Sequence, residues 1–230
     1  MSREVKAKVD LISMPDNMIK IMYVAAKGCY SEHTPIKIWE DEAQYDMLKL
    51  VQKVLRAGHL SIAEHIVITF SIAGMSRVAA QQFTRHRHAT YSMKSQRYVT
   101  YHQPFKYIVP DTVKNSMFYE DYKSHMELVQ IMYEEMLKDG IPAEDARYIF
   151  PNACETSLTA TMNVRQLMHL ANLRLCKKAQ WSIREVVQQM VDLIVIIEPW
   201  LKEFLVPKCE EIGFCNEIKS CGRKPKKEGK

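Results

Sequence analysis

The order of strand-like and helix-like segments constrains the fold of this chain more than any other feature. Residues 65–73 are β-branched and apolar, and residues 154–163 are rich in threonine, so both predict strands; residues 5–12 alternate in polarity and predict a third. Helical patterns fall between and after these strands without regular strand–helix–strand alternation. The order therefore favours an α+β fold, a mixed and mainly antiparallel sheet packed with long helices, over a doubly wound one.

Helical spacing of apolar residues predicts the helices. We expect them over 41–57, 76–84, 112–138, 164–175 and 181–198. Gly58 is expected to end the first, Ser76 to cap the second, and Pro199 to interrupt the last. The longest is expected to end at Asp139–Gly140 and to carry an apolar stripe of Phe118, Tyr122, Val129, Met132 and Met136. Residues 85–101 predict a loop or an irregular strand.

The formal charge of +5 is concentrated at the end of the chain, because residues 219–230 hold six Lys or Arg and one Glu. The remainder is near neutral, which argues against a nucleic-acid-binding surface but not against a local phosphate pocket. No apolar run is long enough for a membrane span, and the first residues do not resemble a secretion signal. We therefore expect a cytoplasmic protein with one domain over 1–215 and a basic, disordered tail over 216–230.

The chain has six cysteines. In a cytoplasmic protein of this size they are expected to be reduced thiols. Cys209, Cys215 and Cys221 follow one another at wider intervals than the two to four residues typical of zinc ligands. The sequence therefore predicts no metal site, and it leaves the role of these three cysteines and of the basic tail open.

Most of the unusual chemistry lies in the segment RHRHATYSMKSQRY, residues 85–98. Arg85, Arg87 and Arg97 bring three guanidinium groups within 13 residues, among several hydroxyl side chains. Guanidinium groups bind phosphate through two parallel hydrogen bonds and stay charged at any working pH. The segment thus predicts a cradle for a phosphorylated ligand. A solvated basic loop or an RNA contact is the alternative that composition alone leaves open.

The same segment resembles the signature of the flavin-dependent thymidylate synthases, R-H-R followed seven residues later by Ser. Four further blocks resemble that family in the same order: residues 58–65, 146–151, 163–174 and 179–184. The last reads AQWSIR, in which Ser182 stands where the family usually has Glu. The resemblance spans roughly residues 5–215.

The resemblance implies a role for each matching residue. It implies that FAD is held by Ser61, Arg85, His86, Arg87, Met93 through its backbone, Asn163, Arg165 and His169. It implies that dUMP is held by Gln82, Arg85, the backbone of Phe83 and Thr84, Lys94, Ser95, Gln96, Arg97, Arg147 and Arg174, with Ser95, Gln96 and Arg97 at the phosphate. Arg174 would be the catalytic residue, positioned to stabilise the ionised uracil ring.

Helix geometry adds one test to these assignments. In the helix expected over 164–175, Arg165, His169 and Asn172 share one face. Arg174 lies about 180° away, since each residue turns the helix by about 100°. The two faces are therefore expected to meet different ligands, or one ligand shared across a subunit boundary.

The implied reaction is the methylation of dUMP to dTMP, with methylenetetrahydrofolate as carbon donor and NADPH as reductant. A Pro-Cys-His motif, which supplies the nucleophile in the other kind of thymidylate synthase, is absent, so no cysteine nucleophile is expected. The resemblance also implies a homotetramer with active sites at subunit junctions. An RNA-binding module and a different flavoenzyme on the same scaffold remain the alternatives.

Overall fold

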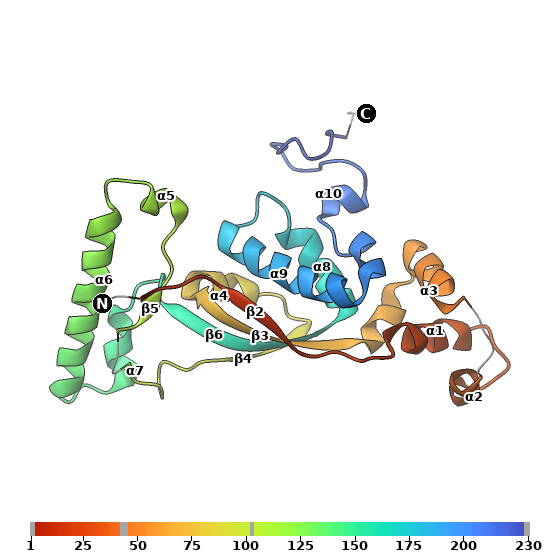
Figure 1. The fold of residues 1–230 in the computed structure, drawn as a ribbon, viewed down its shortest axis with the longest axis horizontal. Helices are drawn as coiled ribbons and strands as arrows, with labels where there is room; N and C mark the ends of the chain where they lie inside the picture. The colour runs from red at the N-terminus through yellow and green to blue at the C-terminus, as the bar shows by residue number, and fades with distance from the viewer. Residues whose placement is uncertain (1–2, 42–45, 102–103, 228–230) are drawn as a thin grey trace.

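A four-stranded antiparallel sheet forms the centre of the computed structural model, which describes residues 3–41, 46–101 and 104–227 (Figure 1). Its strand order is β2-β3-β6-β4. The strands are β2 (Lys8–Ser13), β3 (Val67–Ser76), β6 (Glu155–Asn163) and β4 (Ala89–Met93). The three predicted strands are confirmed, and the segment predicted as a loop or an irregular strand contains a regular strand, β4, at the edge of the sheet.

The two faces of the sheet differ in chemistry. Ile68, Phe70 and Ile72 of β3 are fully buried, and they point with Leu158 and Ala160 of β6 into the main core. Helices α8 (Val164–Arg174) and α9 (Trp181–Ile197) cover this face (Figure 1). The opposite face is lined by Thr and Ser, including a cross-strand hydrogen bond between the hydroxyls of Thr69 and Thr161. One packed face and one polar face are typical of an antiparallel sheet.

The remaining elements lie mainly toward the two ends of an elongated molecule (Figure 1). One end holds α1 (Met18–Gly28), α2 (Pro35–Glu40), α3 (Met47–Arg56) and the 3₁₀ helix η1 (Leu60–His65). The other holds α5 (Asp111–Lys114), α6 (Tyr119–Lys138), α7 (Ala143–Ala146), η2 (Arg147–Ile149) and the parallel pair β1 (Arg3–Glu4) and β5 (Lys106–Tyr107). Helix α3 ends at Arg56, and Gly58, with a φ of +85°, follows its end as the predicted terminator. Part of the predicted 41–57 segment, residues 42–45, lies outside the described residues.

The prediction of one helix over 112–138 is wrong. Residues 115–118 separate α5 from α6, with Ser116 accepting a hydrogen bond from the Phe118 N–H. The predicted apolar stripe is confirmed only in part: Val129 is buried and Tyr122 packs against the same cluster, but Phe118 and Met132 are more than half exposed. The other side chains that α6 buries are Met126, Gln130 and Tyr133. A helix with apolar residues on several sides does not reveal from its sequence which side faces the core.

Helix α4 (Arg77–Phe83) follows β3 directly, and the Ser76 hydroxyl caps it as predicted by accepting the Ala79 N–H. After α9 the chain continues through η3 (Pro199–Glu203) and α10 (Lys208–Glu211) to residue 227. Within the described ranges, none of the helices combines the length and apolar character needed to cross a bilayer.

Gly74 lies at a bulge in β3, where the pairing with β6 shifts register between Ile72 and Met75. Its φ is +70°, and a Cβ there would come within 2.2 Å of the Lys6 carbonyl oxygen. We expect Gly74→Ala to destabilise the protein by about 3 kcal/mol, since backbone strain and overpacking add. Thermal unfolding at fixed protein concentration measures this loss.

Gly140→Ala is the matched control for the bulge. Gly140 also has a positive φ, +88°, but a Cβ there would meet nothing within 4 Å. Its cost is therefore the strain alone, about 1 kcal/mol. Equal decreases in the unfolding midpoint for the two variants would show that close approach at Gly74 does not matter.

Candidate functional site

An imidazole cluster, defined here as His86, His169 and Arg174, lies just before the start of β4. Arg174 Nε donates a 2.9 Å hydrogen bond to His86 Nε2, and the rings of His86 and His169 meet edge to face with centroids 6.2 Å apart. His86 is only 6% exposed. His169 and Arg174 lie about 140° apart around α8, since each residue turns the helix by about 100°, yet both contact His86.

Burial, together with the positive charges of Arg174 and His169, lowers the pKa of His86 from 6.5 to about 4. His86 is therefore a neutral hydrogen-bond acceptor near neutral pH, which suits the guanidinium that donates to it. Burial also lowers the pKa of Arg174. The cluster keeps a cationic side chain in a partly desolvated place, where its field acts strongly on a nearby anion.

The lowered pKa of His86 predicts a pH dependence of stability. Between pH 6.5 and about 4 the unfolded chain binds more protons than the folded chain does, because His86 is protonated only when it is unfolded. The folding stability measured above pH 6.5 is therefore lost in part as pH falls toward 4. We expect a loss on the order of 3 kcal/mol across that window. Urea unfolding of wild type and His86→Asn at a series of pH values measures it. A difference between the two proteins that stays constant with pH would contradict the prediction.

Beside this cluster, the α8 cavity has a volume of about 560 Å³. It is lined by Leu60, Glu64, His88, Asn163, Arg165, Gln166, Met168, His169, Asn172 and Glu211. The predicted common face of Arg165, His169 and Asn172 is thereby confirmed. Arg165 forms an ion pair with Glu64. Asn163 caps α8 by accepting the Gln166 N–H through its side-chain oxygen, which leaves the NH₂ group of the Asn163 amide for another partner.

Gln166 carries an unsatisfied donor at the α8 cavity. The residue is only 5% exposed, and among the described residues its Nε2 has no hydrogen-bond partner. Leaving such a group unpaired costs about 1–3 kcal/mol. The cavity lining thus includes a cation and an imidazole next to the apolar side chains of Leu60 and Met168, with the unpaired Gln166 amide buried just beneath its surface.

The residues from α4 to β4 surround the imidazole cluster unequally. Arg85, Arg87 and Ser61 are exposed, and within the described chain the two arginines form no ion pair. Gln82 Nε2 donates to Gln180 Oε1 at 2.7 Å, which links the RHR segment to the AQWSIR block.

The backbone groups assigned to dUMP are partly used within the chain. The Phe83 carbonyl accepts from the Tyr91 hydroxyl, which also donates to the His86 carbonyl, and the Thr84 N–H donates to the Ala80 carbonyl. Burial raises the pKa of Tyr91 to about 12, so this hydroxyl stays protonated and remains a donor. It thereby holds the RHR turn, residues 85–87, against β4.

The post-β4 turn, residues 94–97, lies beyond the other end of β4. Lys94 pairs with the buried Glu155 at 3.0 Å, and Gln96 donates to the Cys154 sulfur. Burial lowers the pKa of Lys94, but the hydrogen bond and charge of Glu155 outweigh this, so the net shift is upward. Ser95 Oγ accepts the Arg97 N–H, which leaves its hydroxyl proton free to donate to a ligand.

Two further arginines meet near this turn through Glu144. Arg97 forms an ion pair with the Glu144 carboxylate at 2.5 Å, and Arg147 Nε donates to the Glu144 carbonyl at 2.8 Å. Glu144 thus links the turn that holds Ser95 and Arg97 to Arg147, which comes from a separate segment. Met93, at the end of β4, has its sulfur 3.7 Å from an Arg77 nitrogen.

The imidazole cluster and the post-β4 turn lie at opposite ends of β4. The strand spans Ala89 to Met93, about 13 Å at 3.3 Å per residue, and both groups lie beyond its ends. One chain alone therefore does not bring Arg97 next to Arg174. Among the described strands, β4 is an edge strand with Thr90 and Ser92 exposed, and an exposed edge is a place where another chain can associate.

Several residues at the site were not predicted. Glu64, Glu144, Glu155 and Gln180 hold the side chains of Arg165, Arg97, Lys94 and Gln82. Gln180 could have been found in the AQWSIR block. The acidic partners carry no local signal, because their pairing depends on long-range contacts. Gln166 and Glu211 at the α8 cavity were missed for the same reason.

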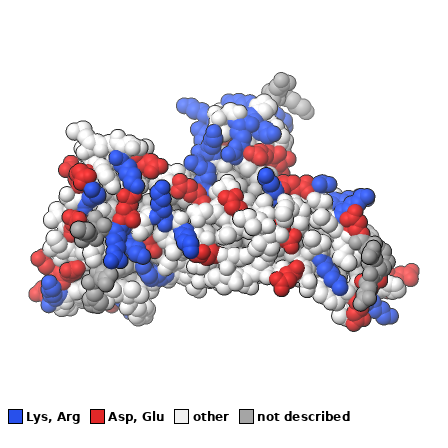
Figure 2. Space-filling view, in the orientation of Figure 1, with Lys and Arg blue, Asp and Glu red and all other residues white. Residues whose placement is uncertain are grey.

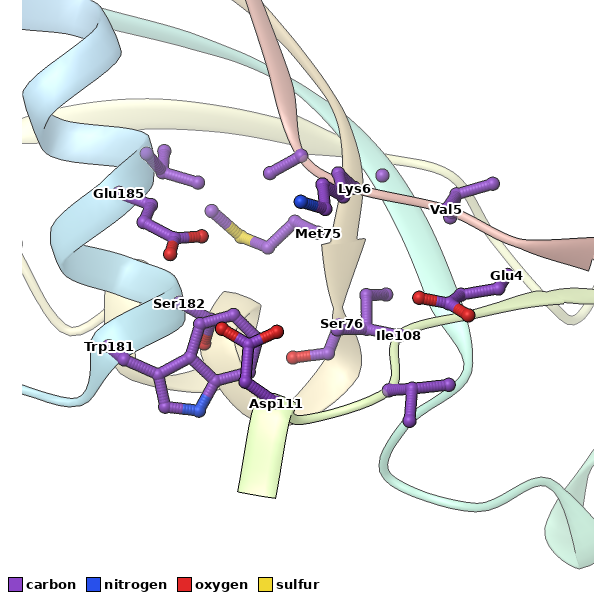
Figure 3. A pocket seen from close by; sticks show the side chains of 14 residues that line it. Glu4, Val5, Lys6, Met75, Ser76, Ile108, Asp111, Trp181, Ser182 and Glu185 are labelled. Atoms are coloured by element: carbon purple, nitrogen blue, oxygen red, sulfur yellow. The ribbon is translucent and has the colours of Figure 1, made fainter. Parts of the chain in front are cut away.

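A second cavity shares no lining residue with either group; Figure 3 shows the side chains around it. Trp181, Ser182 and Glu185 of α9 face Ser76 and Asp111 there, around a volume of about 40 Å³. Burial raises the pKa of Glu185, and the charge of Asp111 adds to the effect. The volume suits ordered water but excludes a nucleotide. The departure from the family pattern at Ser182 thus falls outside both groups.

Comparison with known proteins gives a consistent result. The family model described as "Thymidylate synthase complementing protein" matches residues 10–200. A flavin-dependent thymidylate synthase of Geobacter sulfurreducens is 36% identical over 94% of this chain and 94% of its own length. One from Pyrococcus abyssi is 36% identical over 91% of this chain and 89% of its own.

A solved structure supports the fold. A UMP/dUMP methylase from Streptomyces cacaoi, bound with 5-Br dUMP, superimposes with a TM-score of 0.73 over 86% of this chain and 96% of its own. The sequences are 20% identical. At that identity the likeness concerns the arrangement of the sheet and helices.

Proposed function

The chain belongs to the family of flavin-dependent thymidylate synthases, and from that premise we propose that it methylates dUMP to dTMP with FAD as cofactor. Methylenetetrahydrofolate is the proposed carbon donor and NADPH the proposed reductant. The observation that carries this proposal is the partly buried guanidinium of Arg174, held by the neutral His86 beside a cavity rich in donors.

Arg174 is the proposed catalytic residue. Its positive charge would stabilise negative charge that develops on the uracil ring, which makes C5 more nucleophilic. His86 accepts the Arg174 Nε–H and so positions the guanidinium. Because His86 stays neutral near pH 7, it adds no second positive charge that would push Arg174 away.

The α8 cavity fits a flavin by the chemistry of its lining. An isoalloxazine ring has an edge of nitrogen and oxygen acceptors and an apolar opposite side. The unpartnered Gln166 amide, Arg165 and His169 provide donors, while Leu60 and Met168 provide apolar contact. When bound, FAD supplies the hydride chemistry that the side chains lack. The exposed Arg85, Arg87 and Ser61 and the Met93 backbone are proposed to complete its binding, together with Asn163.

The post-β4 turn is the proposed phosphate site of dUMP. Ser95, Arg97 and Arg147 provide a hydroxyl and two guanidinium groups, and Gln96 and Lys94 are proposed to support them. Gln82 and the RHR turn would meet the nucleoside. The Arg97 N–H aligns the Ser95 hydroxyl. In this proposal Ser95 therefore donates a hydrogen bond to the phosphate of dUMP and does not act as a nucleophile.

The separation of the two groups supports a shared active site. A two-fold axis near the middle of β4 would exchange the ends of two strands, so that the post-β4 turn of one copy lies beside the imidazole cluster of the other. We propose that dUMP binds across this junction, within a homotetramer whose chains each use residues 1–215 as one domain. The exposed Leu128, Ile131 and Met132 of α6 offer apolar surface for further contacts.

The environment of Cys154 supports a reaction without a cysteine nucleophile. Cys154 is the cysteine nearest the post-β4 turn, but it is fully buried, and burial raises its pKa to about 12. Such a thiol stays protonated and is inert as a nucleophile.

The proposed function is tested with the purified full chain. We expect the absorption spectrum of a bound flavin, and release of tritium from C5-labelled dUMP that depends on methylenetetrahydrofolate and NADPH. An RNA-binding module would show no flavin spectrum and a steep salt dependence of RNA affinity. A different flavoenzyme would show the spectrum without tritium release. Either pattern would refute the proposal.

A further inference from the structure

Four of the six cysteines line one cavity, although they come from distant parts of the sequence. The cavity, of about 140 Å³, lies between the end of α8 and the C-terminal segment. Cys176 follows α8 by two residues, and Cys209, Cys215 and Cys221 come from the C-terminal segment. The last three alone are spaced more widely than usual zinc ligands, but Cys176 adds a fourth thiol from another part of the chain.

The C-terminal segment lacks the apolar core that ordinarily holds a chain in place. All of residues 216–227 except the half-buried Lys224 are exposed, and Ile218 is 91% exposed. The segment is nevertheless bent back on the body, since Cys215 N–H donates to the Pro225 carbonyl and Arg223 donates to the Leu175 carbonyl. The sequence predicts residues 216–230 to be a disordered tail; residues 228–230 lie outside the described part. Small coreless segments of this kind are typically fastened by a metal ion or a disulfide.

We propose that Cys176, Cys209, Cys215 and Cys221 bind one Zn²⁺ ion, which fastens the C-terminal segment to the end of α8. Four thiolates are the ligand set that Zn²⁺ takes in structural sites. Binding releases the thiol protons and forms four Zn–S bonds, with no change of oxidation state. All six cysteines are free thiols in the structure, as this chemistry requires.

The surroundings of the four thiols match a negatively charged metal centre. Lys178, Lys208 and Lys219 line the same cavity, and Figure 2 shows Lys and Arg gathered over the C-terminal segment. Zinc with four thiolates carries net negative charge, which these cations offset. The Lys178 N–H donates to the Cys176 sulfur at 3.5 Å, the kind of outer contact that orients a metal ligand.

Binding requires the thiols to move closer together. In the described residues no three Cys, His, Asp or Glu side chains already have metal-ligating spacing. Cys176, Cys209 and Cys215 line the same cavity of about 140 Å³, so these thiols are neighbours across it. Rotation of the side chains and a shift of the exposed Cys221 loop would bring the sulfurs to about 2.3 Å from a shared ion.

The proposed ion would also fix one wall of the α8 cavity. Asn172 lines both cavities and donates to the Val206 carbonyl at 2.9 Å. Glu211, which lines the α8 cavity, lies between Cys209 and Cys215 in the chain. The metal would therefore hold the segment that carries Glu211, independently of what the α8 cavity binds.

The test measures metal in the full chain, free of any tag, after growth with zinc and purification under reducing conditions without chelator. We expect about one zinc per chain in wild type and in Cys29→Ser, whose exposed thiol directly follows α1. Cys176→Ser and Cys209→Ser are expected to lose most of it. Cobalt-loaded wild type should show thiolate charge-transfer absorption that both variants lack.

Three results would overturn the zinc site. The first is the absence of metal from zinc-replete wild type. The second is equal zinc in Cys176→Ser and wild type, which means an adventitious ion. The third is a disulfide between any two of the four cysteines in the protein as isolated. Cys209 is half-buried. If Cys209→Ser does not fold for that reason, the zinc content of Cys176→Ser and Cys221→Ser gives the same test.

Discussion

Arg174→Ala is expected to lower kcat by about 10²–10³-fold, because one well-placed electrostatic donor contributes about 2.7–4 kcal/mol to a transition state. Flavin content should change far less, since Arg165, His169 and Gln166 still line the α8 cavity. The ratio of flavin to protein absorbance and single-turnover dTMP formation measure the two effects on the same sample.

Two further variants make the Arg174 result specific. Arg174→Lys keeps the charge and should recover part of the turnover but not the fork that reaches His86. Arg56, an exposed arginine on α3, is paired with Glu203. Arg56→Ala removes this arginine and should leave turnover unchanged. Parallel loss of flavin and turnover in Arg174→Ala would mean that Arg174 only maintains the cofactor site.

Arg97→Ala is expected to raise the KM for dUMP by about 10–100-fold, the equivalent of one charge-assisted contact of about 1.5–3 kcal/mol to the phosphate. Its kcat should stay within a few-fold of wild type, because the phosphate is remote from the reacting carbon. Deoxyuridine, which has no phosphate, should be converted with the same low kcat/KM by both enzymes. Steady-state kinetics with the two substrates gives the comparison.

Glu144→Gln is the matched control for Arg97. It removes the carboxylate that pairs with Arg97 at 2.5 Å but keeps the arginine and the Glu144 backbone carbonyl that Arg147 contacts. The KM for dUMP should not rise in this variant. If Arg97→Ala reduced kcat/KM equally for dUMP and deoxyuridine, Arg97 would have no role at the phosphate.

The elements that local pattern alone determines were predicted well. The β-branched run at 65–73 became the core of β3, extended to Ser76, and α8 and α9 match their predicted ranges within one residue at each end. Gly58 follows the end of α3 and Ser76 caps the start of α4 as expected, because residues that start or end a helix act through their immediate neighbours. The α5–α6 break and the buried side of α6 were missed, since they depend on which face meets distant side chains.

The candidate site was predicted in its residues more than in its arrangement. The sequence placed Arg165, His169 and Asn172 on one face, which the α8 cavity confirms. The contact of His86 with Arg174 comes from segments 88 residues apart, and no periodicity predicts it. The fourth cysteine at the C-terminal cavity was missed in the same way, because Cys176 is close in space but distant in sequence. The ligand-binding roles of these residues stay predictions.

The central claim is that one active site takes Arg97 from one chain and Arg174 from another. The direct measurement is dTMP formation, at a dUMP concentration far below the wild-type KM, by oligomers assembled from equal amounts of Arg97→Ala and Arg174→Ala chains. Random mixing should give both wild-type arginines at about a quarter of the sites, so activity should return to about that fraction of wild type. Mixed oligomers no more active than the separate variants would contradict a shared site.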